Sequence, residues 1–145
     1  MLNDILYLEL QKAVSFGNLG LHLPVLREYG AEYEYRPPPG HVKLGHSTTC
    51  FQNAYRLAFG EQGNARGWKY IEGYAFRSDK GSAWFHHAWT AEGQYVIDNT
   101  WDAAAGKARY VGAAFPEAFV RKCSKTGYCL DSICIRGLSF PGSTP

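Results

Sequence analysis

The chain has 145 residues, of which 46% are hydrophobic, 15% aromatic and 19% charged. This length suits one globular domain with a buried core and is too short for two. The net charge of +2 lacks the clustered basic excess of most nucleic-acid binders. No apolar run is long enough for a membrane span, and the first residues lack the basic start of a secretory signal. We therefore expect no nucleic-acid or membrane partner and a cytoplasmic location, with secretion by a non-classical route left open.

The first third of the chain predicts a helix and a Pro-rich connection. The apolar pattern of residues 2–14 favours an N-terminal helix, which Gly17 and Gly20 are expected to end. Residues 32–40 include three successive prolines and therefore predict a stiff, extended segment. Too little chain precedes this segment to form a domain, so we expect residues 1–46 to belong to one domain with the rest.

The segment 47–60 predicts the next helix. Apolar and aromatic side chains recur there at helical spacing: Phe51, Ala54, Tyr55 and Ala58. Gly60 is a typical residue at which a helix stops, and Thr49 followed by Gln52 matches a capping box. Cys50 would then lie in the first turn, where free backbone N–H groups and the helix dipole stabilise a thiolate. This position favours a nucleophilic cysteine over an inert core residue.

Three aromatic-rich runs predict antiparallel strands, at residues 70–76, 84–91 and 94–100. Glu92 and Gly93 separate the second run from the third, and a two-residue connection with Gly is typical of a tight hairpin.

The register of this hairpin places a histidine opposite a carboxylate. With Glu92 and Gly93 as the loop, Ala91 faces Gln94, and counting back along both strands makes His87 face Asp98. Directly opposed side chains have Cβ atoms about 5 Å apart, so Asp98 can orient the His87 imidazole. His86 then points to the other face of the sheet.

The four cysteines divide unequally along the chain. Cys50 stands alone, whereas Cys123, Cys129 and Cys134 lie close together near the C-terminus. Their spacing does not match the paired knuckles of a structural zinc site, so we expect three packing residues. A disulfide among them is the open alternative. A thiol at a helix start, a histidine and an orienting acid together have the logic of nucleophilic catalysis.

Four segments in order carry a resemblance to a known family. They are residues 50–54 (CFQNA), 71–74 (IEGY), 87–89 (HAW) and 96–101 (VIDNTW). This order resembles the transglutaminase-like branch of the papain-like cysteine enzymes, which has a Cys at a helix start, then strands with Gly-Tyr, His-Ala-Trp and Asp. The usual lead into the Gly-Tyr strand is replaced here by residues 64–68 (NARGW).

The resemblance implies an α+β fold with a papain-like (transglutaminase-like) core, in which the N-terminus of the catalytic helix packs on an antiparallel β-sheet. It implies a catalytic triad with Cys50 as nucleophile, His87 as base and Asp98 as orienting acid, and no cofactor. The core would span residues 47–101, and residues 102–145 would supply closing elements and a tail. The expected activity is a cysteine-dependent amide hydrolase or acyltransferase (peptidase, deamidase or amidase), working through a thioester on a protein or peptide.

The oxyanion hole and the shielding of the thioester have several candidates. The Cys50 backbone N–H is one donor for the oxyanion, and the second could come from Gln52, Asn53 or His46. Two aromatic residues, Trp89 and Trp101, are candidates for shielding the thioester, or for the core.

Four other functions use the same residues. A protein-crosslinking transglutaminase differs in the acyl acceptor. An arylamine acetyltransferase-like enzyme is a different acyltransferase on the same scaffold, and such enzymes are generally larger. A metal site could combine Cys50 with His46, His86 and His87, although adjacent strand residues diverge and do not easily share an ion. A non-catalytic binding module would keep the fold without the chemistry. Within the catalytic hypothesis, His41, His46 and His86 are other candidates for the general base.

The chain after residue 101 predicts three further elements. Tyr110 and Val111 are expected to begin a strand. Pro116 fits the first turn of a short helix that has Arg121 and Lys122 at its C-terminal end. Residues 133–135 are expected to close the sheet, and the tail to fray.

Overall fold

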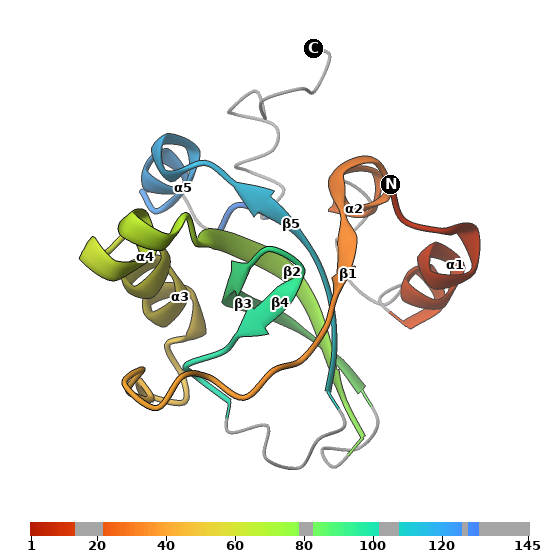
Figure 1. The fold of residues 1–145 in the computed structure, drawn as a ribbon. Coiled ribbons are helices and arrows are strands. Elements are labelled where there is room, and N and C mark those ends of the chain that lie inside the picture. The colour runs from red at the N-terminus through yellow and green to blue at the C-terminus, as the bar shows by residue number, and fades with distance from the viewer. Residues whose placement is uncertain (14–21, 79–82, 102–107, 126–127, 131–145) are drawn as a thin grey trace.

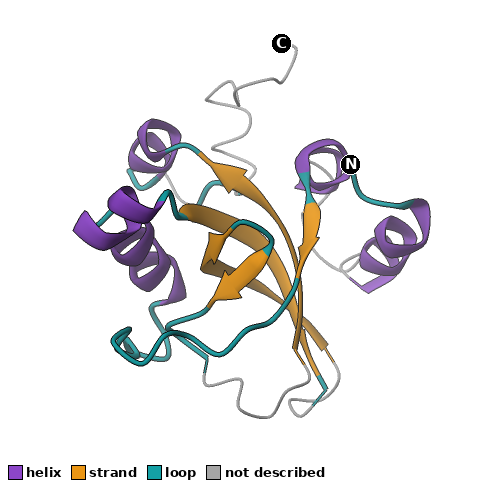
Figure 2. Cartoon of the chain, viewed as in Figure 1, coloured by secondary structure: helices purple, strands orange, loops and turns teal. Residues whose placement is uncertain are grey.

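The structure, a computed structural model, describes residues 1–13, 22–78, 83–101, 108–125 and 128–130 (Figure 1). The expected end of the first helix at Gly17 and Gly20, the expected strand at 133–135 and the tail lie outside the described residues. Over the described part the fold is α+β, with helices packed on an antiparallel sheet as the sequence predicts (Figure 2). None of the helices in this part of the chain is both long and apolar enough to cross a membrane.

The sheet has five strands in the order β1-β5-β2-β3-β4, and each neighbouring pair is antiparallel. The strands are β1 (Ala31–Tyr33), β2 (Lys69–Arg77), β3 (Ala83–Glu92), β4 (Tyr95–Ile97) and β5 (Ala108–Phe115). The long central strands β2 and β3 confirm the predictions at residues 70–76 and 84–91. The strand at Tyr110 and Val111 is also confirmed, whereas β4 is shorter than the predicted 94–100.

The sheet curls until its two edges meet. Glu34, one residue beyond β1, bridges to β4: its N–H donates to the Gln94 carbonyl at 2.8 Å, and its carbonyl accepts from Val96 N–H at 2.9 Å. The Tyr33 and Trp89 rings, on β1 and β3, lie 5.9 Å apart although two strands separate them in the sheet. Side chains on the concave face therefore meet across the interior of the curl.

Five helices accompany the sheet in the described residues. They are α1 (Asp4–Ala13), α2 (His22–Tyr29), α3 (Cys50–Ala58), α4 (Glu61–Arg66) and α5 (Glu117–Cys123). Figure 1 shows α3, α4 and α5 on one flank of the sheet and α1 and α2 on the other. In α1, Leu6 and Leu10 form a buried stripe, and Asn3 Oδ1 accepts from Leu6 N–H at 2.8 Å to cap the helix.

Two clusters of buried side chains lie on opposite faces of the sheet. The convex face packs against α1, α2, α3 and α5, with Tyr70, Tyr74 and Val111 as its sheet contribution. The concave face gathers a second cluster around Trp89 and Tyr110. The sequence pattern does not predict α2, β1 and α4, because each is eight residues or fewer and gives only a weak periodic signal.

The hairpin between β3 and β4 differs in register from the prediction. Glu92 pairs with Tyr95, so the loop is Gly93 and Gln94 rather than Glu92 and Gly93. Gly93 has φ 58°, a left-handed conformation that glycine adopts without strain. Glu92 stays in the strand because its carboxylate accepts from Trp68 Nε1 at 2.6 Å and pairs with Arg66 at 3.2 Å.

The start of α3 is also formed differently from the prediction. Thr49 is the N-cap residue, but its side chain caps no helical N–H, so the capping box with Gln52 is absent. Thr49 Oγ1 donates instead to the His46 carbonyl at 3.1 Å and to Asn53 Oδ1 at 3.2 Å. The predicted helix 47–60 is thus confirmed in position but begins three residues later.

At the other end of the described chain, the predicted short helix is confirmed as α5. Pro116 stands at its N-cap, and Arg121 and Lys122 lie in its last turn. These two cations complement the negative end of the helix dipole.

Candidate active site

Cys50 is the first residue of α3. Its side chain is half-buried, and its backbone N–H belongs to the first helical turn, where no acceptor exists inside the helix. The preceding loop is polar: the Thr48 hydroxyl contacts His46 Nδ1 at 2.8 Å. The thiol therefore lies at the positive end of the helix dipole, as the sequence predicts.

His87 and Asp98 form a buried pair. Nε2 of His87, on β3, hydrogen-bonds to Oδ2 of Asp98 at 2.8 Å, and the side chains are 2% and 1% exposed. The predicted contact between these two residues is confirmed, but not its geometry. The register of the hairpin places Thr90 opposite Ile97, so His87 and Asp98 meet as diagonal neighbours beyond the end of the ladder.

The Asp98 carboxylate accepts four hydrogen bonds. Oδ2 accepts the Tyr110 hydroxyl at 2.9 Å as well as His87, while Oδ1 accepts the backbone N–H groups of Thr100 at 2.8 Å and Trp101 at 3.1 Å. The two backbone bonds form an Asx turn, which begins directly after β4. Each lone-pair direction of the carboxylate therefore has a donor, and the carboxylate has one orientation.

Tyr110 is a further member of this site, and no sequence motif predicts it there. The residue lies on β5, which is separated from β3 by β2 in the sheet, and only the curl brings its hydroxyl to Asp98. Burial, and then the charge of Asp98, raise the pKa of Tyr110 above its usual value, so the hydroxyl keeps its proton and donates. The only signal in the sequence is an aromatic residue in a predicted strand, which does not distinguish this role from packing.

The His87 ring also hydrogen-bonds to the Cys50 thiol. Because Nε2 is bound to Asp98, Nδ1 is the atom left to face the sulfur. Burial lowers the pKa of His87, but the hydrogen bonds and negative charges of Asp98 and Cys50 outweigh it and raise the pKa from 6.5 to about 9. At neutral pH the imidazole is therefore charged and can stabilise an anion at Cys50.

The two candidate tryptophans occupy different positions. Trp101 stacks on the His87 ring with centroids 4.0 Å apart and an interplanar angle of 17°, and it remains half-buried. Trp89 is fully buried in the concave cluster, against Tyr110. Trp101 is thus placed to shield the imidazole and the sulfur from water, whereas Trp89 serves as core.

Asn53 ties the start of α3 to the segment that follows β4. Its Nδ2 donates to the His46 carbonyl and to the Thr100 hydroxyl, both at 2.9 Å. Asn99 Nδ2 returns a bond to the Asn53 carbonyl at 3.3 Å. Because Thr100 also donates its N–H to Asp98, the helix that carries Cys50 and the turn that carries Asp98 are held as one unit.

These contacts decide between candidates for the second oxyanion donor. Asn53 uses both amide N–H bonds in the structure, so it has none left to donate. Gln52 lies about 200° around α3 from Cys50 and lines a cavity on the flank of the helix. His46 is exposed and contacts Thr48, and its role stays a prediction.

Glu72, on β2, is a buried carboxylate that the sequence analysis missed. It accepts from the Tyr70 hydroxyl at 2.9 Å and from the backbone N–H groups of Cys129 at 3.1 Å and Leu130 at 3.0 Å. His86 Nε2 lies 3.1 Å away on the same convex face, opposite to the face of His87. His86 is therefore part of a separate group of side chains, as the alternation along β3 predicts.

The remaining described cysteines are buried together. Cys123 and Cys129 are 0% and 1% exposed, both are free thiols, and a hydrogen bond links them. Burial, and then the charge of Glu72, raise the pKa of the Cys129 thiol. Their predicted packing role is confirmed, while Cys134 lies outside the described residues. Within the described ranges no three His, Cys, Asp or Glu side chains converge in a way that could hold a metal ion.

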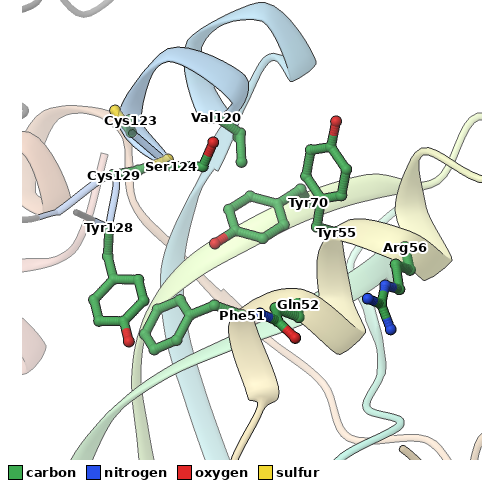
Figure 3. A pocket seen from close by; sticks show the side chains of 10 residues that line it. All are labelled: Phe51, Gln52, Tyr55, Arg56, Tyr70, Val120, Cys123, Ser124, Tyr128 and Cys129. Atoms are coloured by element: carbon green, nitrogen blue, oxygen red, sulfur yellow. The ribbon is translucent and has the colours of Figure 1, made fainter. Parts of the chain in front are cut away.

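A cavity of about 460 Å³ opens between α3 and α5 (Figure 3). Aromatic rings form much of its wall, from Phe51 and Tyr55 on α3, Tyr70 on β2 and Tyr128. It lies on the convex side of the sheet, so the Cys50–His87–Asp98 group and the cavity share α3 but not their lining residues.

Comparison with known proteins assigns no family. No protein-family model matches the chain, and no curated protein or solved structure matches it. The resemblance to the transglutaminase-like enzymes therefore stays a prediction from four sequence segments.

Proposed function

We propose that the protein is a cysteine-dependent amide hydrolase or acyltransferase with a papain-like (transglutaminase-like) core, acting on a protein or peptide. One observation carries the proposal: the His87 ring is bound at one side to the Cys50 thiol and at the other to Asp98. A nucleophile, a base and an orienting acid are the components of catalysis by a covalent intermediate. The order of the four segments along the chain supports the same activity.

The chemistry begins with attack on the amide. The Cys50 sulfur bonds to the carbonyl carbon, and the negative charge that develops on oxygen is stabilised by the Cys50 backbone N–H at the helix start. The C–N bond breaks as the His87 imidazolium gives its proton to the departing amine. A thioester on Cys50 remains, and His87 is neutral.

The second half of the reaction regenerates the thiol. His87 takes a proton from an attacking water, the hydroxide oxygen bonds to the thioester carbon, and the carboxylic acid leaves Cys50. An attacking amine in place of water gives acyl transfer, which is the crosslinking alternative. Asp98 holds the ring in one orientation throughout, and Trp101 limits the access of bulk water to it.

Two alternatives gain less support from the geometry. A binding module without catalysis would not require four hydrogen bonds to orient a buried carboxylate on a histidine that in turn contacts a thiol. A metal site made of Cys50, His46, His86 and His87 conflicts with the sheet, because His86 and His87 lie on opposite faces.

The thiol itself provides the test. At neutral pH we expect iodoacetamide to alkylate Cys50 at least about tenfold faster than Cys123, Cys129 or Cys134, because thiolate content and access control the rate. His87→Gln should slow the alkylation of Cys50, since it removes the cation that stabilises the thiolate. His86→Gln is the matched control and should leave the rate within about twofold. Equal labelling of all four cysteines would contradict the proposal.

The activity is identified by mass spectrometry of a peptide library incubated with the protein. Cleavage gives two fragments, deamidation converts an amide to an acid, and crosslinking joins two peptides with loss of ammonia. Cys50→Ala should abolish each product while circular dichroism shows an intact fold. If Cys50→Ala unfolds the protein, Cys50→Ser distinguishes a packing role from a nucleophilic one, because it preserves size.

A further inference from the structure

The cavity between α3 and α5 is not lined by Cys50, His87 or Asp98. We infer that it is a specificity pocket that takes an aromatic or long aliphatic side chain of the peptide substrate, with an acidic residue beside that side chain at Arg56. The inference rests on the proposed function, since it names the class of substrate that reaches Cys50.

The walls of the cavity favour an apolar occupant. Phe51 and Tyr128 stack with centroids 3.8 Å apart and an interplanar angle of 14°, and together they form one side of the opening (Figure 3). The buried thiols of Cys123 and Cys129 also line the cavity. A concave site of about 460 Å³ whose wall is largely aromatic, with polar groups at Gln52, Arg56 and Ser124, is typical of a site for an apolar side chain.

The cavity lies close to Cys50. Phe51, the next residue in the chain, directs its ring into the cavity (Figure 3). Burial, and then the charge of Glu72, raise the pKa of the cavity residue Tyr70 well above its usual value, and the charge of Cys50 is near enough to add to the rise. A peptide whose carbonyl lies at Cys50 therefore has a neighbouring side chain within reach of the cavity.

One of the residues that line the cavity, Arg56, carries a positive charge. Arg56 is exposed at the rim and forms no ion pair with any residue in the described ranges. Arg121, on nearby α5, is by contrast paired with Glu117 at 2.7 Å. A carboxylate on the ligand would complement Arg56, and the planar guanidinium binds carboxylates in a defined orientation.

Peptidyl chloromethyl ketones test this inference at Cys50. Their methylene carbon bonds to the Cys50 sulfur as chloride leaves, so the rate of thioether formation reports how well the peptide binds. We expect a phenylalanyl probe to react at least about tenfold faster than a glycyl probe. A probe with aspartate beside phenylalanine should react faster than one with lysine there.

Two variants connect these preferences to the cavity. Tyr128→Ala removes a wall residue that is 51% exposed, and should reduce the phenylalanyl-to-glycyl rate ratio several-fold. Arg56→Gln should abolish the preference for aspartate over lysine. Lys69→Gln is the matched control, because Lys69 is an exposed cation on β2 outside the cavity, and it should leave both ratios unchanged.

The outcomes separate this inference from the proposed function. Suppose that iodoacetamide alkylates Cys50 rapidly but the phenylalanyl-to-glycyl rate ratio is near one. This result overturns the specificity pocket and leaves the proposed function standing. If Cys50 is inert to every reagent, the proposed function fails. The pocket is then decided by nuclear magnetic resonance with N-acetyl-phenylalanine: shifts of the Phe51, Tyr55 and Tyr128 amides at millimolar probe support it, and unchanged spectra overturn it.

Discussion

The Asp98 carboxylate is fully buried and holds His87 in the candidate catalytic group. Its four hydrogen bonds come from three different parts of the chain: His87 on β3, Tyr110 on β5 and the turn at Thr100 and Trp101. A buried carboxylate without such donors would be costly to ionise. The four donors therefore satisfy the buried Asp98 carboxylate and fix it against His87 in a site that excludes water.

Asp98→Asn tests this electrostatic role. The amide is neutral and cannot accept all four bonds. The variant therefore loses the strongest contribution that raises the pKa of His87, while burial still lowers it. We expect the pKa of His87 to fall well below its value of about 9. The measurement is the titration of the His87 ring protons by nuclear magnetic resonance, with His41 and His46 as internal controls. An unchanged pKa would show that Asp98 does not set the charge of the ring.

The elements place the site through one close contact between backbones and one contact between side chains. Gly73 on β2 pairs with His87 on one side and with Gly112 on the other, so strand β5 approaches β2 where the catalytic histidine lies. Asn53 fixes the start of α3 to the turn after β4. A change at either contact should move Cys50 and His87 relative to each other.

Gly73→Ala tests the contact within the sheet. The new Cβ would overlap the Val111 carbonyl and lie 2.5 Å from Gly112 Cα, and neither backbone atom can move away without opening the ladder. We expect the free energy of unfolding to fall by about 2 kcal/mol or more, measured by urea denaturation. Gly40→Ala is the control, because a Cβ at Gly40 meets nothing within 4 Å and the stability should change by less than about 0.5 kcal/mol.

Asn53→Ala tests the contact between helix and turn. It removes the donors to His46 and Thr100, and should lower the free energy of unfolding by about 2 kcal/mol and slow the alkylation of Cys50. The neighbouring Gln52 side chain is exposed, so Gln52→Ala should change stability by less than about 0.5 kcal/mol. If the two variants alkylate at the same rate, Asn53 does not position Cys50.

The molecule as a whole couples this site to its stability. The curled sheet buries His87 between the helix that carries Cys50 and the concave cluster, so the protonation of His87 is linked to folding. The pKa of His87 is about 9 in the folded chain and near 6.5 when unfolded. The folded state therefore binds more protons than the unfolded state between these two values.

Stability should consequently fall as the pH rises from about 6.5 to 9. The contribution of His87 is fully present below its unfolded pKa, and it is lost as the pH rises through the folded pKa, with a slope of at most about 1.4 kcal/mol per pH unit. Urea unfolding at intervals between pH 6 and 9.5 measures the slope. The free energy of unfolding of His87→Gln should depend less on pH over the same range. An identical slope in both proteins would contradict the prediction.

Local sequence patterns specified much of this arrangement. Helical spacing and the flanking polar residues placed Cys50 at a helix start, and strand alternation placed His87 and Asp98 on one face and His86 on the other. The hairpin register was wrong by one residue on each strand, yet the pairing survived because such a change preserves the face to which a side chain points. Faces and helix starts depend on residues close together in the chain.

The other features required contacts between distant segments. The hairpin loop is Gly93 and Gln94 instead of Glu92 and Gly93, because Trp68 and Arg66 hold Glu92 in its strand. No local sequence pattern indicates those two partners. Tyr110 reaches Asp98 only because the sheet curls. Its hydrogen bond, like the cavity between α3 and α5, comes from side chains that the sequence separates and packing brings together, so the tertiary structure alone decided them.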